Sequence, residues 1–241
     1  MVTVEPLAQG SRRVPNTDHP LDRPAWNTLR GAWRPLAQEA GGALRLDPDY
    51  GPFAGSSELT VDGLGELAGF DLGAAGLDLV EPEPIAPPPG LVLGLQAKLV
   101  QMTAGEITPG GREIEAVSLE EADGAQMLAL AQLTRPGPFA ARTHRLGGFI
   151  GVKSKGRLVA VAGERMRPEG FCEVSGVCTH PDHRGRGYAG GLMRRVARRI
   201  LERGETPFLH CFETNTGAVA LYETLGFRVR RTLVLTVLKR P

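Results

Sequence analysis

The stretch that decides the fold is Val177-Cys-Thr-His-Pro-Asp-His-Arg-Gly-Arg-Gly-Tyr-Ala189, in which a predicted strand gives way to a predicted helix near Gly187. The first N–H groups of a helix have no acceptor within that helix, and the helix dipole favours negative charge beside them. Gly185 and Gly187 permit a tight turn and a close approach of the backbone to a ligand, while Arg184 and Arg186 add positive charge. The turn therefore predicts a binding site for a diphosphate.

This turn differs from the two common nucleotide-binding motifs. It lacks the Gly-Lys-Ser/Thr ending of a P-loop, and the Gly-x-Gly-x-x-Gly pattern of dinucleotide-binding domains is absent from it. A basic, glycine-rich turn on its own is also typical of plain loops. Its interpretation therefore depends on the elements that surround it.

Alternating and helical hydrophobic patterns lie on both sides of the turn. Residues 148–153, 157–164 and 171–179 are typical of strands joined by short turns, which predicts antiparallel pairing. Residues 188–203 carry an apolar stripe at helical spacing, with arginines on the opposite face. The other expected elements are a strand at 112–118, a helix after the capping box Ser118–Glu121, a short helix at 139–145, a strand at 207–212, a helix at 215–225 and two strands within 226–239. This order predicts a mixed α/β fold with one central, largely antiparallel sheet flanked by helices.

Charge and proline content divide the chain in two. Residues 1–110 contain 7 Lys and Arg against 14 Asp and Glu, whereas residues 181–241 contain 12 against 5. A proline-rich segment at 81–90 interrupts any helix or central strand, and a turn-like stretch at 104–111 follows it. We therefore expect a smaller N-terminal α/β domain at 1–110 and a second domain at 111–241, whose basic end favours an anionic ligand.

The N-terminal part contains few readable elements. Residues 24–40 have apolar side chains at helical spacing, although Pro35 would kink or end that helix. Residues 91–102 are typical of one or two strands. No residues here have catalytic spacing, so the sequence leaves the role of this part open.

A second motif, Asn215-x-x-Ala218-x-x-Leu221-Tyr222-x-x-x-Gly226-Phe227, follows the basic turn by about thirty residues. Together with Arg184-x-x-Gly187-x-Ala189 it resembles the GNAT superfamily of acetyl-CoA-dependent N-acetyltransferases, whose acyl-CoA turn follows the pattern Gln/Arg-x-x-Gly-x-Gly/Ala. The resemblance runs from about residue 112 to the end and implies a GNAT-type central sheet. Thr134-Arg-Pro-Gly-Pro-Phe139 is more similar to the glycine-N-acyltransferase-like subgroup. The likeness of residues 1–110 is weaker, and two-domain members of the family carry a degenerate copy of the fold there.

The resemblance implies acetyl-CoA as co-substrate and assigns residues to it. The pantetheine arm would enter between the strands at 171–179 and 207–212, which diverge in this family. The implied cofactor-binding residues are Val177, Cys178, Thr179, Arg184, Gly185, Arg186, Gly187, Tyr188, Ala189 and Asn215. Asn215 could equally cap the helix that starts there. Arg194 or Arg195 would reach the ribose phosphate, or would simply lie on a solvated helix face.

The resemblance also implies two catalytic residues. Tyr222 matches the tyrosine that protonates the departing thiolate, although it could instead only pack against the cofactor sulfur. A tyrosine has a pKa near 10 and a thiol near 8.5, so this transfer is uphill by roughly 2 kcal/mol unless the site tunes one of them. Glu173 matches the carboxylate that takes a proton from the incoming ammonium, or it is a paired carboxylate. The amine would attack the thioester directly, within a ternary complex.

Several other classes of protein and site are not expected. Cys178, His180, His183, His210 and Cys211 match no common zinc spacing, so we expect no metal. The chain has only 13 aromatic residues, with no stacking pattern in the arginine-rich helix, so we expect no nucleic-acid partner. No apolar run of about 18 residues predicts a membrane span. Residues 1–14 lack the pattern of a secretory signal, which indicates a cytoplasmic protein.

The sequence therefore predicts an enzyme that transfers an acetyl group from acetyl-CoA to a primary amine of a small molecule or a peptide. The alternative is a non-catalytic CoA-binding regulatory module, which would keep the turn but would not need Glu173 or Tyr222. The amine acceptor, the acyl-chain preference and the oligomeric state stay open at this point.

Overall fold

The computed structural model describes residues 19–241. Within them an eight-stranded sheet has the order β4-β11-β5-β10-β9-β8-β7-β6, and a separate three-stranded sheet has the order β1-β2-β3. The strands of the large sheet are β4 (Leu77–Glu81), β5 (Val92–Thr103), β6 (Val117–Leu119), β7 (Phe149–Ser154), β8 (Arg157–Glu164), β9 (Phe171–Thr179), β10 (Thr206–Phe212) and β11 (Arg228–Lys239). The small sheet consists of β1 (Ala37–Ala40), β2 (Ala43–Leu46) and β3 (Ala54–Ser56). Neighbouring strands of the large sheet are antiparallel, apart from the parallel pair β9 and β10.

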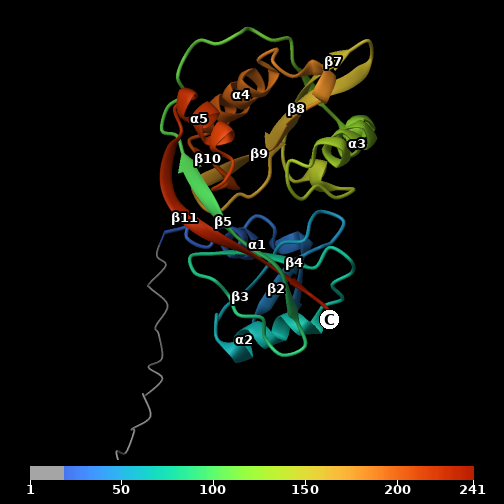
Figure 1. Ribbon diagram of the computed structural model, residues 1–241, viewed down its shortest axis with the longest axis vertical. Helices are drawn as coiled ribbons and strands as arrows, with labels where there is room; N and C mark the ends of the chain where they lie inside the picture. The colour runs from blue at the N-terminus through green and yellow to red at the C-terminus, as the bar shows by residue number, and fades with distance from the viewer. Residues whose placement is uncertain (1–18) are drawn as a thin grey trace, which may run out of the picture.

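Helices lie on both sides of this sheet. They are α1 (Pro24–Arg30), α2 (Val61–Gly65), α3 (Gly124–Thr134), α4 (Tyr188–Glu202) and α5 (Thr216–Thr224). Single turns of 3-10 helix are η1 (Arg34–Leu36), η2 (Glu66–Gly69), η3 (Glu121–Asp123), η4 (Thr143–Arg145) and η5 (Pro181–His183). In Figure 1, α4 and α5 lie on one side of β8 and β9 and α3 lies on the other. The mixed, largely antiparallel sheet flanked by helices is therefore confirmed.

Helix α4 packs its apolar face against the central strands of the large sheet. Leu192, Val196 and Ile200 are fully buried and pack against the strands β8, β9 and β10. At Gly191 an added Cβ would lie 2.8 Å from the Ile114 side chain, so only glycine allows the segment before β6 to lie this close to the helix. These contacts fix α4 against the sheet, so that its N-terminus follows directly on the end of β9.

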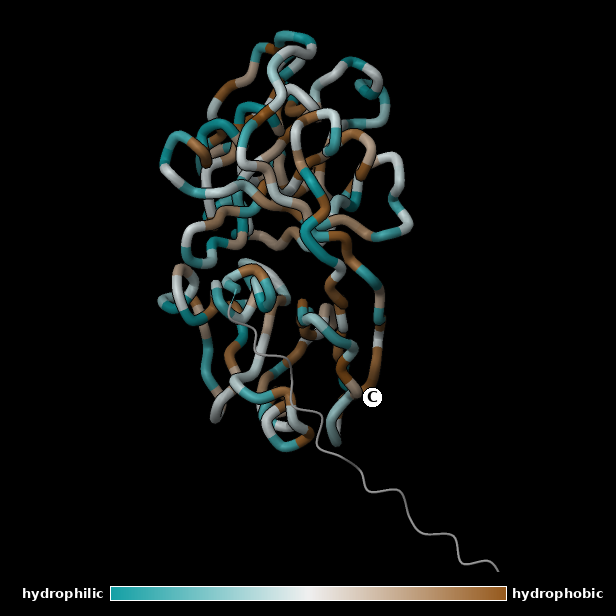
Figure 2. Tube along the Cα trace, turned by 90° about the vertical axis from the view of Figure 1, so that its left-hand side faces the viewer, coloured by the Kyte–Doolittle hydropathy of each residue, from teal (hydrophilic) through white to brown (hydrophobic). Residues whose placement is uncertain are grey.

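The N-terminal segment shares both a sheet and a core with the rest of the chain. Strand β5 lies between β10 and β11, and β11 pairs with it along its length. Figure 1 shows β5 and β11 running from the upper half into the lower half, where α1, α2 and the small sheet lie. Trp26 and Phe53 pack in one cluster with Phe208 and Leu233. In Figure 2, hydrophobic residues follow the strand that reaches the C-terminus. The division at residues 104–111 into two domains stays a prediction.

Some local predictions are wrong. Residues 226–239 form one long strand with a bulge between Val229 and Arg231, because pairing with β5 carries the chain through this irregularity without a turn. The helix expected at 24–40 ends at Arg30, and residues 37–40 form β1 after Pro35. The capping box uses Glu120 and Asp123 rather than Ser118 and Glu121, because Ser118 is taken into β6.

Two predictions concern the start of the chain and the membrane. Among the helices of residues 19–241, none combines the length and the apolar character that a membrane crossing requires. The prediction that residues 1–14 contain no secretory signal lies outside the described residues.

Candidate functional site

The two strands expected to admit the pantetheine arm diverge inside the sheet. β10 pairs in parallel with β9 only from Thr206 to Phe208, opposite Phe171 to Glu173. Beyond that point β10 pairs with β5 and β9 pairs with β8, so a V-shaped gap opens between them. Within the diverging part of β9, Gly176 adopts φ +64° and the register with β8 shifts. Backbone groups of both strands therefore face the gap without a strand partner there.

The turn after β9 presents a row of free backbone amides. Gly187 has φ +79° and stands immediately before the first residue of α4, a conformation that favours glycine. Within the part of the chain that the structure describes, none of the six N–H groups from Gly185 to Gly190 has a hydrogen-bond acceptor. The positive end of the 15-residue helix α4 lies at the same place. The arrangement suits a multiply charged anion.

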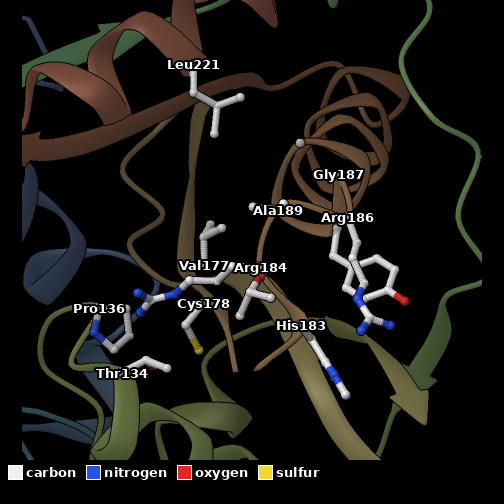
Figure 3. A pocket seen from close by; sticks show the side chains of 14 residues that line it. Thr134, Pro136, Val177, Cys178, His183, Arg184, Arg186, Gly187, Ala189 and Leu221 are labelled. Carbon is white, nitrogen blue, oxygen red and sulfur yellow. The ribbon is translucent and has the colours of Figure 1, made fainter. Parts of the chain in front are cut away.

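A cavity of about 370 Å³ lies between the end of β9 and the turn that follows it. Its lining residues are Thr134, Pro136, Val177, Cys178, Thr179, His183, Arg184, Gly185, Arg186, Gly187, Tyr188, Ala189, Gly190 and Leu221. In Figure 3, Thr134 and Pro136 lie on the opposite side of the cavity from His183 and Arg186. Every residue expected to bind the cofactor lines this cavity except Asn215, and neither Glu173 nor Tyr222 lines it.

Residues that the sequence reasoning missed also line the cavity. Thr134, Pro136, Gly190 and Leu221 come from α3, the loop after it, α4 and α5. Their positions depend on how these elements pack against β9, which no local pattern reveals. The sequence analysis weighs His183 only as a metal ligand. Its position within the basic turn is the signal that indicates a place in the cavity lining.

Glu173, the expected base, is a buried and fully paired carboxylate. Its side chain is only 1% exposed and accepts from Arg165 at both oxygens, at 2.9 and 3.1 Å. His210 Nδ1 lies 3.0 Å from Glu173 Oε1. Burial alone would raise the pKa of the Glu173 carboxyl, but the charge of Arg165 and the hydrogen bonds from His210 and Arg165 lower it to about 2. Glu173 is therefore ionised and a weak proton acceptor.

A buried amide determines which nitrogen of His210 carries a proton. Gln101 Oε1 accepts from Arg230 at 2.9 Å, so its Nε2 faces the Leu21 carbonyl and His210 Nε2, at 2.9 and 3.0 Å. Because the amide donates to His210 Nε2, that nitrogen is an acceptor and Nδ1–H donates to Glu173. These contacts make Nδ1 the donor and Nε2 the acceptor of the His210 ring.

A solved structure from Novosphingobium aromaticivorans, described as an acetyltransferase of the GNAT family, is 48% identical to this chain. The match covers 93% of this chain and 100% of that one, with a TM-score of 0.86. The chain belongs to the GNAT family.

Other comparisons are consistent with GNAT membership. The family model described as FR47-like protein matches residues 149–235, which include β9, the turn and α4. An acetyltransferase from Yersinia pestis is 36% identical over 58 residues, which are 23% of this chain and 40% of that relative. This chain therefore covers less than half the length of that relative. A GCN5-related N-acetyltransferase from Kribbella flavida, 19% identical over 88% of this chain and 93% of its own, shares the fold with a TM-score of 0.61.

In this GNAT protein Tyr222 packs against the core and does not line the cavity. Its ring is part-buried against the core and lies 6.4 Å from that of Phe227. Burial, with a further contribution from the neighbouring Cys211, raises the pKa of Tyr222 to about 12. The phenol is therefore protonated at neutral pH and holds its proton more tightly than a free tyrosine.

Three further residues that the sequence analysis considered as ligand-binding have partners within the fold. Asn215 caps α5, because its Oδ1 accepts from the Ala218 N–H at 3.2 Å. Arg194 donates to the Thr108 carbonyl at 3.3 Å and Arg195 to the Ile114 carbonyl at 2.6 Å. These two arginines hold the segment before β6 against α4.

The cysteines and histidines considered as metal ligands occupy separate environments. Among residues 19–241, no group of three or more His, Cys, Asp or Glu is placed to hold a metal ion. Burial raises the pKa of the Cys178 thiol to about 11, so little thiolate forms at neutral pH. The Thr179 hydroxyl and both ring nitrogens of His183 are buried and find no hydrogen-bond partner in the described part of the chain. These unpaired groups line the cavity.

Proposed function

We propose that this protein is an N-acetyltransferase that moves the acetyl group of acetyl-CoA to a primary amine. The observation that carries the proposal is the row of unpaired N–H groups from Gly185 to Gly190, placed beside the gap between β9 and β10. Free amides at a helix N-terminus bind a diphosphate, and the gap offers a path for the pantetheine arm. GNAT membership and the acetyltransferases among its relatives support the same reaction.

The residues that line the cavity divide into three roles under this proposal. The turn from Arg184 to Ala189 holds the diphosphate, with the backbone as donor and Arg184 and Arg186 as counter-charges. Val177 and Thr179 offer backbone groups to the pantetheine amides, and Cys178 contributes to the wall. Asn215 caps α5 and also contacts the pantetheine arm. Acetyl-CoA supplies the activated acyl group, and these residues position its thioester in the gap.

Direct transfer requires that the amine and the thioester meet in one complex. The amine nitrogen forms a bond to the acetyl carbon, the carbon–sulfur bond breaks, and the sulfur leaves with the electron pair. An N–H group near the start of the gap polarises the thioester carbonyl. Holding both reactants together supplies much of the rate, because it replaces a bimolecular encounter by an intramolecular step.

His210 is the group that takes the proton from the amine, and Glu173 positions His210. A carboxylate with a pKa of about 2 gains little from accepting a proton at neutral pH. Its hydrogen bond keeps Nδ1 protonated and leaves His210 Nε2 as the basic atom, once the Gln101 amide turns aside for the amine. Glu173 is then a positioning residue, and its negative charge stabilises the imidazolium that forms.

Tyr222 donates its phenolic proton to the departing sulfur, and the second proton that the amine nitrogen loses on forming the amide restores the phenol. With a pKa of about 12 against about 8.5 for a free thiol, this transfer is uphill by roughly 5 kcal/mol in the cofactor-free protein. Positive charge near the phenol in the ternary complex would reduce this cost. Proton donation is most useful here in the transition state, where the sulfur carries the developing charge.

The remaining proposals concern the amine acceptor, the subgroup of the family, the cellular location and residues 1–110. The acceptor is an amine of a small molecule or a peptide, bound on the sheet side where Glu173 and His210 lie. The likeness of residues 134–139 to the glycine-N-acyltransferase-like subgroup and a cytoplasmic location belong to this proposal. So does the interpretation of residues 1–110 as a domain derived from a second GNAT-like half.

The test is a free-thiol release assay with acetyl-CoA and a panel of amines that includes amino acids, small aliphatic amines and peptides. Amine-dependent release of CoA thiol, with acetylated amine identified by mass spectrometry, is the expected result. Binding of acetyl-CoA without turnover on any amine would favour the regulatory-module alternative. Absence of acetyl-CoA binding would refute the proposal.

A further inference from the structure

A second hollow, of about 430 Å³, lies in the half of the molecule that contains α1 and the small sheet (Figure 1). We call it the tryptophan hollow, and the residues that define it are Trp26, Arg30, Arg34, Glu39, Leu44 and Ser57. It has no lining residue in common with the cavity beside the turn, and its residues precede the segment that the FR47-like family model matches. The mechanism proposed above uses none of them. Its volume is in the range of sites that bind small molecules.

The buried part of the lining is apolar and closely packed. Trp26 is 7% exposed and Leu44 is 6% exposed, and both belong to one hydrophobic cluster. At Gly55 an added Cβ would lie 2.9 Å from the Trp26 ring, so glycine lets β3 pack directly against the indole. The Arg23 guanidinium lies 5.3 Å from the centroid of the same ring and is itself held by Glu81, at 2.6 Å. The indole is therefore fixed before a ligand arrives, which reduces the entropy lost on binding.

The exposed part of the lining carries an excess of positive charge. Arg34 and Glu39 form an ion pair with each other. Arg30 has no carboxylate within ion-pair distance in residues 19–241, and its guanidinium lies 5.8 Å from the centroid of the Trp26 ring. A guanidinium stacked on an aromatic ring keeps its N–H donors in the plane of the group, where they can bind a carboxylate through two parallel bonds. One uncompensated cation therefore lies directly beside a buried apolar surface.

We propose that the tryptophan hollow binds a small organic carboxylate, whose charged group pairs with Arg30 and whose apolar body packs on Trp26 and Leu44. The carboxylate matches the paired donors of the guanidinium, and the exposed Ser57 hydroxyl adds a further donor. The apolar body gains by leaving water for the indole and leucine surface. Glu39 limits the affinity, because its charge repels the ligand and its carboxylate occupies Arg34. This site does not depend on the acetyl transfer proposed above.

The experiment titrates the full chain with phenylacetate and follows the indole N–H signal of Trp26 and the amide signal of Ser57 by NMR. Phenylacetate combines a carboxylate with a planar apolar body, and phenylacetamide offers the same body without the charge. We expect both signals to shift in a saturable way with phenylacetate. Phenylacetamide should bind at least about tenfold more weakly, because it lacks the charge-assisted bonds to Arg30.

Two variants have opposite expected effects. Arg30→Gln should weaken phenylacetate binding about tenfold, because the paired cation is lost. Glu39→Gln should strengthen it about threefold, because the opposing charge is removed and Arg34 is released. Damage to the fold does not produce a gain in affinity, so the second variant keeps the test decisive if Arg30→Gln disturbs the packing on Trp26. The matched control is Arg198→Gln, which removes an exposed cation from α4 and should bind like the wild type.

Four results would overturn the inference. Signals of Trp26 and Ser57 that do not shift, or that shift without saturation, would show that the hollow takes no such ligand. Equal affinities for phenylacetate and phenylacetamide would remove the recognition of charge. Shifts confined to residues 185–190 would assign the carboxylate to the turn before α4 instead. Unchanged affinity in both Arg30→Gln and Glu39→Gln would place the carboxylate away from these side chains.

Discussion

Replacing Gly187 by aspartate tests the central claim that the turn binds an anion through its backbone. Gly187 has φ +79°, and an added Cβ would meet only the Arg112 side chain, at 3.4 Å. The new side chain therefore fits, and the cost of the positive φ is about 1 kcal/mol. The variant should fold, because a carboxylate before the first turn of a helix also interacts favourably with the helix dipole.

The effect on binding comes from charge. A carboxylate about 5 Å from a phosphate charge, at an effective dielectric constant near 20, costs about 3 kcal/mol. Acetyl-CoA should therefore bind about 100-fold more weakly, since each 1.4 kcal/mol is a factor of ten. Titration calorimetry measures this loss directly. Gly187→Ala keeps the backbone strain without the charge and should lose only a few-fold in affinity.

Gly204 offers a matched control at the other end of α4. It has φ +78° and no heavy atom within 4 Å of an added Cβ, so Gly204→Asp introduces the same residue at nearly the same φ. It should bind acetyl-CoA like the wild type, although its negative charge near the C-terminal end of the helix lowers stability more. If Gly187→Asp folds and binds acetyl-CoA with unchanged affinity, or if both variants lose affinity equally, the reasoning is refuted.

Three further predictions concern single side chains. Tyr222→Phe should lower kcat by about 10²–10⁴-fold while the affinity for acetyl-CoA stays within a few-fold, and unchanged turnover would exclude Tyr222 as the acid. Glu173→Gln should lower kcat and change the shape of the pH–rate profile, because the carboxylate that accepts from His210 Nδ1 is lost; a profile of unaltered shape would exclude the base role. Burial raises the pKa of Asp78 from 3.8 to about 6, so the folded state loses stability as the pH rises from about 4 to about 6. Asp78→Asn should therefore stabilise the protein by up to about 3 kcal/mol at pH 8 and little at pH 4 in urea unfolding, and an equal gain at both pH values would contradict the assignment.

Local patterns in the sequence were sufficient for the elements around the site. The strands expected at 157–164 and 171–179 have those bounds in the structure, and the helix expected at 188–203 ends one residue earlier. Periodicity of two or of 3.6 residues is a property of one segment, so it can be recognised without its neighbours. Gly187 and the arginines around it likewise indicated a turn that is suited to binding an anion.

The tertiary structure decided what depends on residues far apart in the chain. Strand β5 enters the sheet between β10 and β11, and Glu173 meets Arg165 and His210 only because β8, β9 and β10 lie side by side. The acidity of a carboxyl or phenol depends on burial and on charges brought near it by folding, so the sequence could name Glu173 and Tyr222 but not their pKa values. The sequence alone determined the segments and their chemistry, whereas long-range packing decided which groups are free to react.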